Sequence, residues 1–447
     1  MENNHLRKQL FSIILPIAAQ NLLSALVSAS DALMLGGLNQ ASLSAVSLAT
    51  QVTFVSTLFY MALTIGATTL AAQYWGKRQA NKVEDILSIV LKYSMVISIA
   101  FWALSLFTPN FLMQIFTNDA ELAVLGVEYL QIVSWSYLCM GITQIYLCIM
   151  KNTDRTLRST IYGTTALVTN LILNGVLIYG MFGFPKMGIS GAALATVIAR
   201  LLELLLVITE NFRKDVVKIN FSTFFHKHTE LNRDFIKYTT PVMANELAWG
   251  CGFTMFSVIM GHLGSDAVAA NSIANIVKNI ISCVCMGIGA GSGIVIGNVL
   301  GTGDLEGAKK LGDKLFKLAL IAGAVSGGII LIVSPFIVHF STTLSEQARG
   351  YLKIMLLICS YYMIGKSINS TVIAGIFCAG GDTTFGLICD IITMWVIIVP
   401  IGLVSAFVLK LPVLVVYVLL NLDEMIKLPA VYKHYKKYRW VKNITKE

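Results

Sequence analysis

Twelve long apolar stretches follow one another along the chain, separated by short polar or charged segments. Each is about 20 to 33 residues long, and about 20 apolar residues suffice for a helix to cross a bilayer. Transmembrane β-strands need only about 9–11 residues of alternating polarity, so a barrel is not expected. Only 13% of the residues are charged, about half the fraction in soluble domains. The sequence predicts an all-α, polytopic integral membrane protein with twelve transmembrane helices, at 11–35, 46–75, 86–108, 124–149, 159–182, 188–209, 234–261, 268–300, 315–340, 351–378, 384–409 and 411–430.

The distribution of basic residues predicts the orientation. With the N-terminus in the cytoplasm, 26 of the 33 lysines and arginines fall in segments on the cytoplasmic side. This is the bias that the positive-inside rule describes. We therefore expect both termini in the cytoplasm and a location in the cytoplasmic membrane. The net charge of +9 then reflects topology and contact with anionic membrane lipid, not nucleic acid.

The two halves of the chain are related by an internal repeat. Residues 16–76 align without a gap on residues 241–301, with 12 of 61 positions identical, among them Pro16/Pro241 and Gly36/Gly261. An offset that covers an even number of spans gives both halves the same orientation, related by a pseudo-two-fold axis along the membrane normal. We expect two six-helix lobes with a cavity between them. The predicted parts are an N-terminal lobe at 1–212, a cytoplasmic linker at 213–233, a C-terminal lobe at 234–432 and a basic cytoplasmic tail at 433–447.

Several motifs in both halves resemble a known transporter family. They are Asp31-Ala-Leu-Met-Leu-Gly36, the run from Asn170 to Gly180, Gly191-Ala-Ala-Leu-Ala-Thr196 and Ala379-Gly-Gly-Asp-Thr383. The pattern is similar to that of the multidrug and toxic compound extrusion family. The resemblance implies a non-enzymatic, twelve-helix antiporter, a monomer that exports organic compounds, often aromatic cations, in exchange for Na⁺ or H⁺.

The resemblance also implies the site residues. In the N-terminal lobe, Asp31, Asn170, Asn174 and Thr196 would form the cation site, with Asn174 where some relatives carry a carboxylate. In the C-terminal lobe, Glu246 matches a functional carboxylate of many members. A second acid that certain members carry is replaced by Ser367. Coupling is therefore expected at the N-terminal site, or through a proton at Glu246.

Physical chemistry selects an overlapping set of residues. Asp31, Glu203, Glu246, Lys278, Lys366 and Asp390 fall within apolar stretches. Each ionisable group costs about 2.5–3.5 kcal/mol at the centre of a spanning helix. These side chains must therefore face water or pair with one another.

The N-terminal set has the chemistry of a cation site. Asn170 and Asn174 are four residues apart and share a helix face, and their amide oxygens, the Thr196 hydroxyl and the Asp31 carboxylate are hard ligands suited to Na⁺. A desolvated carboxylate could carry a proton instead. The sequence leaves both coupling ions open, and also a purely structural Asp31 that accepts interhelical hydrogen bonds. No other metal site and no cofactor are expected.

The C-terminal candidates also have alternative interpretations. Glu246 near mid-membrane could receive a cationic substrate or a proton, or it could pair with Lys278 or Lys366. We expect Lys366 to belong to the same substrate or proton site and to pair with Glu246 or Asp390. Trp249 is the expected aromatic residue of a substrate cavity, and Arg200–Glu203 is expected to be a local structural pair.

Other functions are less well supported. Gly365-Lys366-Ser367 resembles the end of a nucleotide-binding loop, but Ser360 replaces the first glycine, so ATP is not expected as the energy source. The second hypothesis is a flippase or exporter of lipid-linked saccharides in the same superfamily. It remains an alternative because such proteins often have a more basic cavity, to which Lys278 and Lys366 would contribute.

Overall fold

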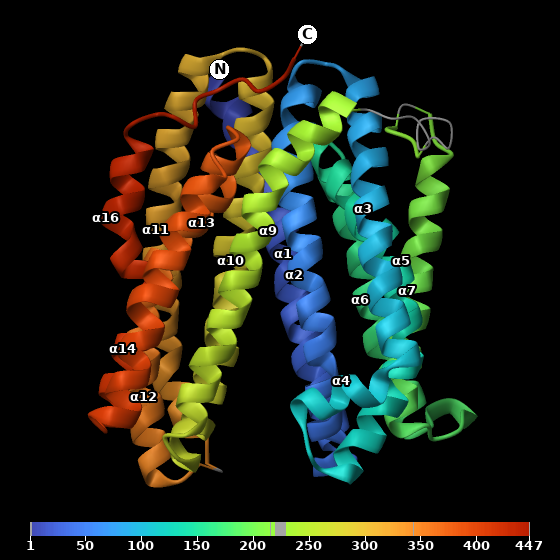
Figure 1. Ribbon diagram of the computed structural model, residues 1–447, viewed down its shortest axis with the longest axis vertical. Helices are drawn as coiled ribbons and strands as arrows, with labels where there is room; N and C mark the ends of the chain where they lie inside the picture. The colour runs from blue at the N-terminus through green and yellow to red at the C-terminus, as the bar shows by residue number, and fades with distance from the viewer. Residues whose placement is uncertain (1, 215, 220–228, 343, 447) are drawn as a thin grey trace. The chain divides into compact units, whose positions relative to one another are not determined.

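The computed structural model describes residues 2–214, 216–219, 229–342 and 344–446, and all regular secondary structure in these residues is helical (Figure 1). Eleven helices in the described part are long and apolar enough to cross a membrane. The expected all-α membrane fold is confirmed. Residues 215 and 220–228 of the expected linker lie outside the described residues.

Two compact units make up the chain, residues 23–236 and residues 1–22 with 237–447. The boundaries fall inside two long helices, α1 and α9. The first unit contains the second part of α1 and the helices up to the start of α9. These elements are α1 (Glu2–Gly36), α2 (Gln40–Gly76), α3 (Ala80–Phe107), α4 (Pro109–Phe116), α5 (Ala120–Asn152), α6 (Thr156–Tyr179), η1 (Met181–Gly183), α7 (Gly188–Asn211) and α9 (Thr229–Gly261).

Helix α5 is central to the unit 23–236, because it packs against α2, α3, α6 and α7. Close contact depends on a small residue: a side chain at Gly141 would collide with Ser98 of α3. Tyr129, Leu130, Ile178 and Ala193 belong to one buried apolar cluster in this unit. This packing fixes the relative positions of α5, α6 and α7, which carry three of the predicted cation-site residues and their neighbour Tyr129.

The second unit is built around α10, α11 and α12, and α12 continues directly into a π-helical turn, η2. Its core includes the side chains of Met355, Cys359, Ile398 and Tyr417. The elements after α9 are α10 (Ser265–Gly301), α11 (Leu305–Phe340), α12 (Glu346–Asn369), η2 (Ser370–Phe377), α13 (Thr384–Asp390), η3 (Ile391–Ile398), α14 (Val399–Leu403), η4 (Val404–Val408), α15 (Val413–Leu420) and α16 (Asp423–Tyr435).

Helix boundaries follow the internal repeat. The offset of 225 residues maps both ends of α2 onto both ends of α10, and the first residue of α3 onto the first residue of α11. The matched glycines Gly36 and Gly261 are the last residues of α1 and α9. The repeat seen in the sequence is therefore a repeat of helical elements.

The last predicted span, 411–430, is not one continuous helix. It is divided into α15 and α16 by a turn at Asn421–Leu422, and α16 extends to Tyr435. Three charged residues, Asp423, Glu424 and Lys427, follow this break, and all three are buried. The 26 basic residues that the sequence analysis assigns to the cytoplasmic side include Lys427, and the structure buries its ammonium group in ion pairs.

Two adjacent glycines of α11 provide a matched test of this packing. A Cβ at Gly327 would lie 2.4 Å from the backbone oxygen of Ser360 in α12, whereas a Cβ at Gly328 would meet nothing within 4 Å. We expect Gly327→Ala to lower the free energy of unfolding by about 1–3 kcal/mol through overpacking. Gly328→Ala should leave it unchanged or slightly raised. Thermal unfolding of the purified variants measures both, and equal stabilities would contradict this account of the α11–α12 contact.

Candidate functional site

The four side chains predicted for the N-terminal cation site form one continuous polar chain. Asn174 Nδ2 donates to Asp31 Oδ1 at 2.6 Å and lies 3.4 Å from Asn170 Oδ1, and Asn170 Nδ2 donates to Thr196 Oγ1 at 3.2 Å. The chain therefore links α1, α6 and α7 within one unit. Asn174 is 2% exposed and Asn170 is 8% exposed, so the amides lie away from the surface.

Local helix geometry explains this arrangement. Asn170 and Asn174 are one turn apart on α6 and face the same direction. The Thr196 hydroxyl also donates to the Ala192 carbonyl of its own helix at 3.1 Å, which fixes its rotamer. Near the end of α6, the Tyr179 hydroxyl donates to the Met34 carbonyl of α1 at 2.7 Å. This second link between α1 and α6 holds Asp31 against Asn174.

The cluster has oxygen atoms available for a ligand. Asn174 Oδ1 is buried and has no hydrogen-bond partner among the described residues. Among the described residues, Asn174 alone donates a hydrogen bond to the Asp31 carboxylate. Buried polar atoms are usually satisfied, and an exception requires an explanation. An amide oxygen next to a carboxylate fits a small monovalent cation, which would satisfy both groups.

Tyr129 of α5 is a further member that the sequence analysis missed. Its hydroxyl lies beside that of Thr196, and Asp31 is close enough to interact with it electrostatically. The residue is buried within the unit. No sequence signal distinguishes it from the other 15 tyrosines of the chain, because its position depends on how α5 packs against α7.

A buried network of charges occupies the second unit. Lys366 of α12 lies 3.5 Å from Glu424 Oε1, Lys427 lies 3.3 Å from Glu424 Oε2, and Lys427 donates to Asp390 Oδ1 at 2.8 Å. Glu424 also accepts a hydrogen bond of 2.7 Å from Asn369. Four charged side chains therefore alternate in sign. Such pairing is how charged groups are accommodated at membrane depth.

This network corrects the expected partners of Lys366. Its ion pair is formed with Glu424, not with Glu246 or Asp390. Asp390 pairs with Lys427 instead. Lys278 also has other partners than Glu246, since it donates to Asn421 Oδ1 at 3.4 Å and lies 4.6 Å from the centre of the Tyr362 ring. The expected alternative of a Glu246 salt bridge to either lysine is therefore wrong for the described structure.

Glu246 of α9 is thereby left as an acid without a direct partner among the described residues. Lys366 and Asp390 are near enough to act on it electrostatically. Trp249, one turn further along α9, stacks on Phe253 with ring centres 5.8 Å apart. The Lys366 ammonium lies 5.2 Å from the centre of the Trp249 ring, a favourable cation–π contact. Glu246, Trp249 and Lys366 are therefore neighbours.

A separate pair of charges lies within α7. Arg200 and Glu203 form the expected local pair on α7 at 2.9 Å, and Thr143 of α5 donates to Glu203 at 3.0 Å. Among the described residues, no three or more His, Cys, Asp or Glu side chains are grouped to hold a metal ion. The oxygen cluster around Asp31 has a single carboxylate, which suits a monovalent ion better than a divalent one.

Comparisons with known proteins agree with the fold and the repeat. The sequence profile of the family described as MatE matches residues 16–176 and again 241–404. The uncharacterized transporter YisQ of Bacillus subtilis is 23% identical over 433 residues, which cover 97% of this chain and 94% of the relative. The multidrug resistance protein NorM of Vibrio cholerae is 29% identical over 283 residues, which cover 62% of this chain and 61% of that protein.

Solved structures share the fold at low sequence identity. A transporter of the MOP superfamily from Pyrococcus furiosus superposes with a TM-score of 0.88 at 17% identity, covering 97% of this chain and 95% of that one. A crystal structure of MATE in complex with MaL6 gives a TM-score of 0.88 at 18% identity, with 97% and 96% coverage.

Proposed function

The chain belongs to the MatE family of membrane transporters, and on that premise we propose that it is a secondary active multidrug efflux antiporter. It exports organic, often cationic and aromatic, compounds by alternating access, in exchange for Na⁺ or H⁺. The transporter lies in the cytoplasmic membrane with both termini in the cytoplasm, acts as a monomer, and needs neither ATP nor a cofactor.

The observation that carries this proposal is the polar chain around Asp31. It contains the partly buried carboxylate of Asp31 and the buried amide oxygen of Asn174, which has no hydrogen-bond partner among the described residues. A bound cation would coordinate the Asn174 amide oxygen and neutralise the Asp31 carboxylate. Without a cation, neither group is fully satisfied. Ion binding is therefore favourable at this site. Asn170, Thr196 and Tyr129 hold the Asp31 carboxylate and the Asn174 amide in place. We assign coupling to this site.

The second unit supplies the substrate or proton site in this proposal. Three lysines, Lys278, Lys366 and Lys427, each contact a carboxylate, an amide oxygen or an aromatic ring. Their charges are therefore partly or wholly compensated, while Glu246 has no direct partner among the described side chains. An organic cation beside Glu246 and the face of Trp249 would gain both a charge interaction and a cation–π interaction. A proton on Glu246 would compete with it for the same charge.

Transport by purified protein in vesicles tests the function. A fluorescent organic cation is loaded, and a Na⁺ gradient or a H⁺ gradient is imposed separately. We expect one of the two gradients to accelerate dye movement at least about tenfold over the gradient-free rate, which corresponds to an activation free energy lower by about 1.4 kcal/mol. Movement of a lipid-linked saccharide under conditions in which neither gradient moves the dye would favour the flippase hypothesis and refute the antiporter.

A further inference from the structure

A basic hollow lies at one end of the unit 23–236, apart from the polar chain around Asp31. Its volume is about 730 Å³, and its lining includes Trp75 at the end of α2, Arg155 and Arg158 at the start of α6, and Arg213 and Lys214 after α7. The sites assigned above for the ion and the substrate use none of these residues. The hollow is therefore available for another ligand.

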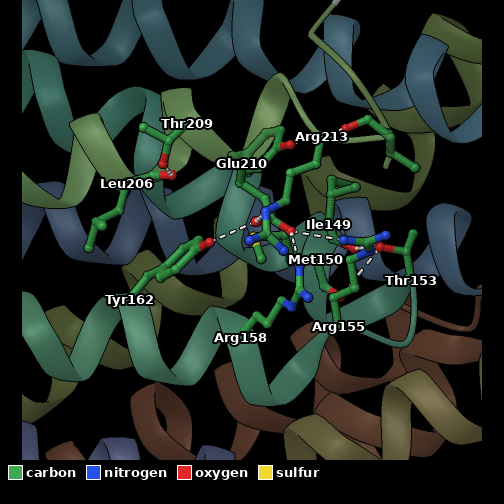
Figure 2. Close-up of polar contacts among 12 residues, drawn as sticks. Ile149, Met150, Thr153, Arg155, Arg158, Tyr162, Leu206, Thr209, Glu210 and Arg213 are labelled. Carbon is green, nitrogen blue, oxygen red and sulfur yellow. Dashed lines mark hydrogen bonds and ion pairs between the residues drawn. The ribbon is translucent and has the colours of Figure 1, made fainter. Parts of the chain in front are cut away.

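A wholly buried carboxylate organises the arginines, as Figure 2 shows. Glu210 Oε1 accepts from Arg155 at 2.8 Å and from Arg158 at 3.2 Å, while Oε2 accepts from Tyr162 at 2.6 Å. Arg213 Nε lies 3.3 Å from the same Oε2. The Arg158 guanidinium contacts Glu210 through Nη1, and the Arg213 guanidinium contacts it through Nε. The Arg158 and Arg213 side chains remain 46% and 53% exposed, so their other N–H groups can reach a ligand.

The charges do not balance around this carboxylate. Of the described residues that line the hollow, four are basic, and Asp154 is acidic. Asp154 accepts a hydrogen bond from Trp75 Nε1 at 2.8 Å. With Glu210 included, two positive charges are left in excess. Lys214 forms no hydrogen bond or ion pair with any described residue. Preorganised guanidinium groups with excess positive charge are a recognition site for phosphate.

An apolar surface continues from the hollow along α6. Leu157 lines the hollow and is 62% exposed, and Ile161, one turn further on the same face, is 50% exposed. Both belong to a helix that is apolar enough to cross the membrane. A ligand with a phosphate group and a hydrocarbon chain can therefore use the arginines and this apolar strip together. A soluble phosphate would use only the arginines.

We propose that this hollow binds the phosphate headgroup of an anionic phospholipid, with an acyl chain lying along Leu157 and Ile161. Basic pockets at the ends of transmembrane helices bind lipid headgroups by the same electrostatics. Arg158, Arg213 and Lys214 contact the phosphate, and Glu210 acts as a positioning residue that holds the guanidinium groups. The bound lipid fixes the ends of α6 and α7 at the membrane surface.

Native mass spectrometry of the full-length protein in detergent tests the proposal, with dioleoylphosphatidylglycerol as the probe. We expect Arg158→Gln/Arg213→Gln to weaken its binding at least about tenfold, because two charge-assisted contacts are lost. Lys214→Gln, which leaves the bonds to Glu210 intact, should weaken it about threefold. The matched control Lys309→Gln/Lys310→Gln removes the same charge from α11 and should change the affinity less than about twofold.

Two competitors identify the source of the phosphate. Dioleoylphosphatidylcholine, which has no net charge, and soluble glycerol 1-phosphate are both expected to compete at least about tenfold less well than the anionic lipid. Glycerol 1-phosphate that competes equally would overturn the lipid assignment in favour of a soluble phosphate ligand. If the double variant fails to fold, the test rests on Lys214→Gln. Unchanged affinity of that variant for dioleoylphosphatidylglycerol would refute the site.

Discussion

Asp31→Asn is expected to abolish gradient-driven transport while the protein remains folded. The substitution keeps the size of the side chain and an oxygen that can accept from Asn174 at the position of the 2.6 Å bond. It removes the only negative charge of the polar chain that also includes Asn170 and Thr196. A hydrogen bond or ion contact to a charged group contributes about 1.5–3 kcal/mol, so the rate under a favourable ion gradient should fall about 10- to 100-fold. Initial rates of dye movement in vesicles measure this loss.

Asp304→Asn is the matched control for this prediction. Asp304 directly precedes α11 and accepts one hydrogen bond, from the backbone N–H of Gly307 at 2.8 Å. The same chemical change is therefore made at another aspartate with a single well-defined donor. We expect its transport rate to stay within about twofold of the wild type, because exposed polar groups contribute little. Full ion coupling in Asp31→Asn, or an equal loss in both variants, would refute the role assigned to Asp31.

Lys427→Met is expected to have the largest effect on stability. Lys427 is 4% exposed and lies 2.8 Å from Asp390 and 3.3 Å from Glu424. Methionine has a similar volume and no charge, so the substitution leaves Asp390 without its ion-pair partner. Removing one partner of a buried ion pair costs about 3–5 kcal/mol. The free energy of unfolding, measured by denaturant titration in detergent, should fall by about that amount.

A second substitution should restore much of this loss. Lys427→Met/Asp390→Leu removes both charges, while Glu424 keeps its contacts with Lys366 and Asn369. We expect at least about half of the lost free energy to return, because replacing a whole buried pair by apolar side chains is close to neutral. Lys309→Met, which breaks an exposed pair with Glu306, should cost less than about 1 kcal/mol. A double variant less stable than Lys427→Met would contradict the pairing.

Sequence alone was sufficient for much of the fold and for the N-terminal cluster. Long apolar stretches define the spans because no other structure satisfies the backbone in hydrocarbon. Asn170 and Asn174 were placed on one face by helical periodicity, and that face points toward Asp31. Periodicity thus placed the two asparagines together, whereas the resemblance to the transporter family implied that Asp31 and Thr196 join them, and neither pointed to Tyr129.

The ion pairs of the second unit could not be predicted in the same way. Lys366 and Glu424 are 58 residues apart, and their contact depends on which face of α16 packs against α12. The predicted span 411–430 is interrupted at Asn421–Leu422, and α16 begins after this break. The buried Lys427 could not be recognised before that turn was known, because a lysine near the end of a span normally extends to the membrane surface.

Reciprocal coupling through Asp31 is the most direct test of the central claim. Vesicles that contain the transporter are given a gradient of the organic cation and no ion gradient, and the counter-movement of Na⁺ and H⁺ is followed. Coupling free energy acts in both directions, so we predict that outward dye flow draws one of the two ions inward in the wild type and in Asp304→Asn. In Asp31→Asn no such ion movement should occur. Wild-type ion movement in Asp31→Asn, at an unchanged ratio to the dye, would contradict the account.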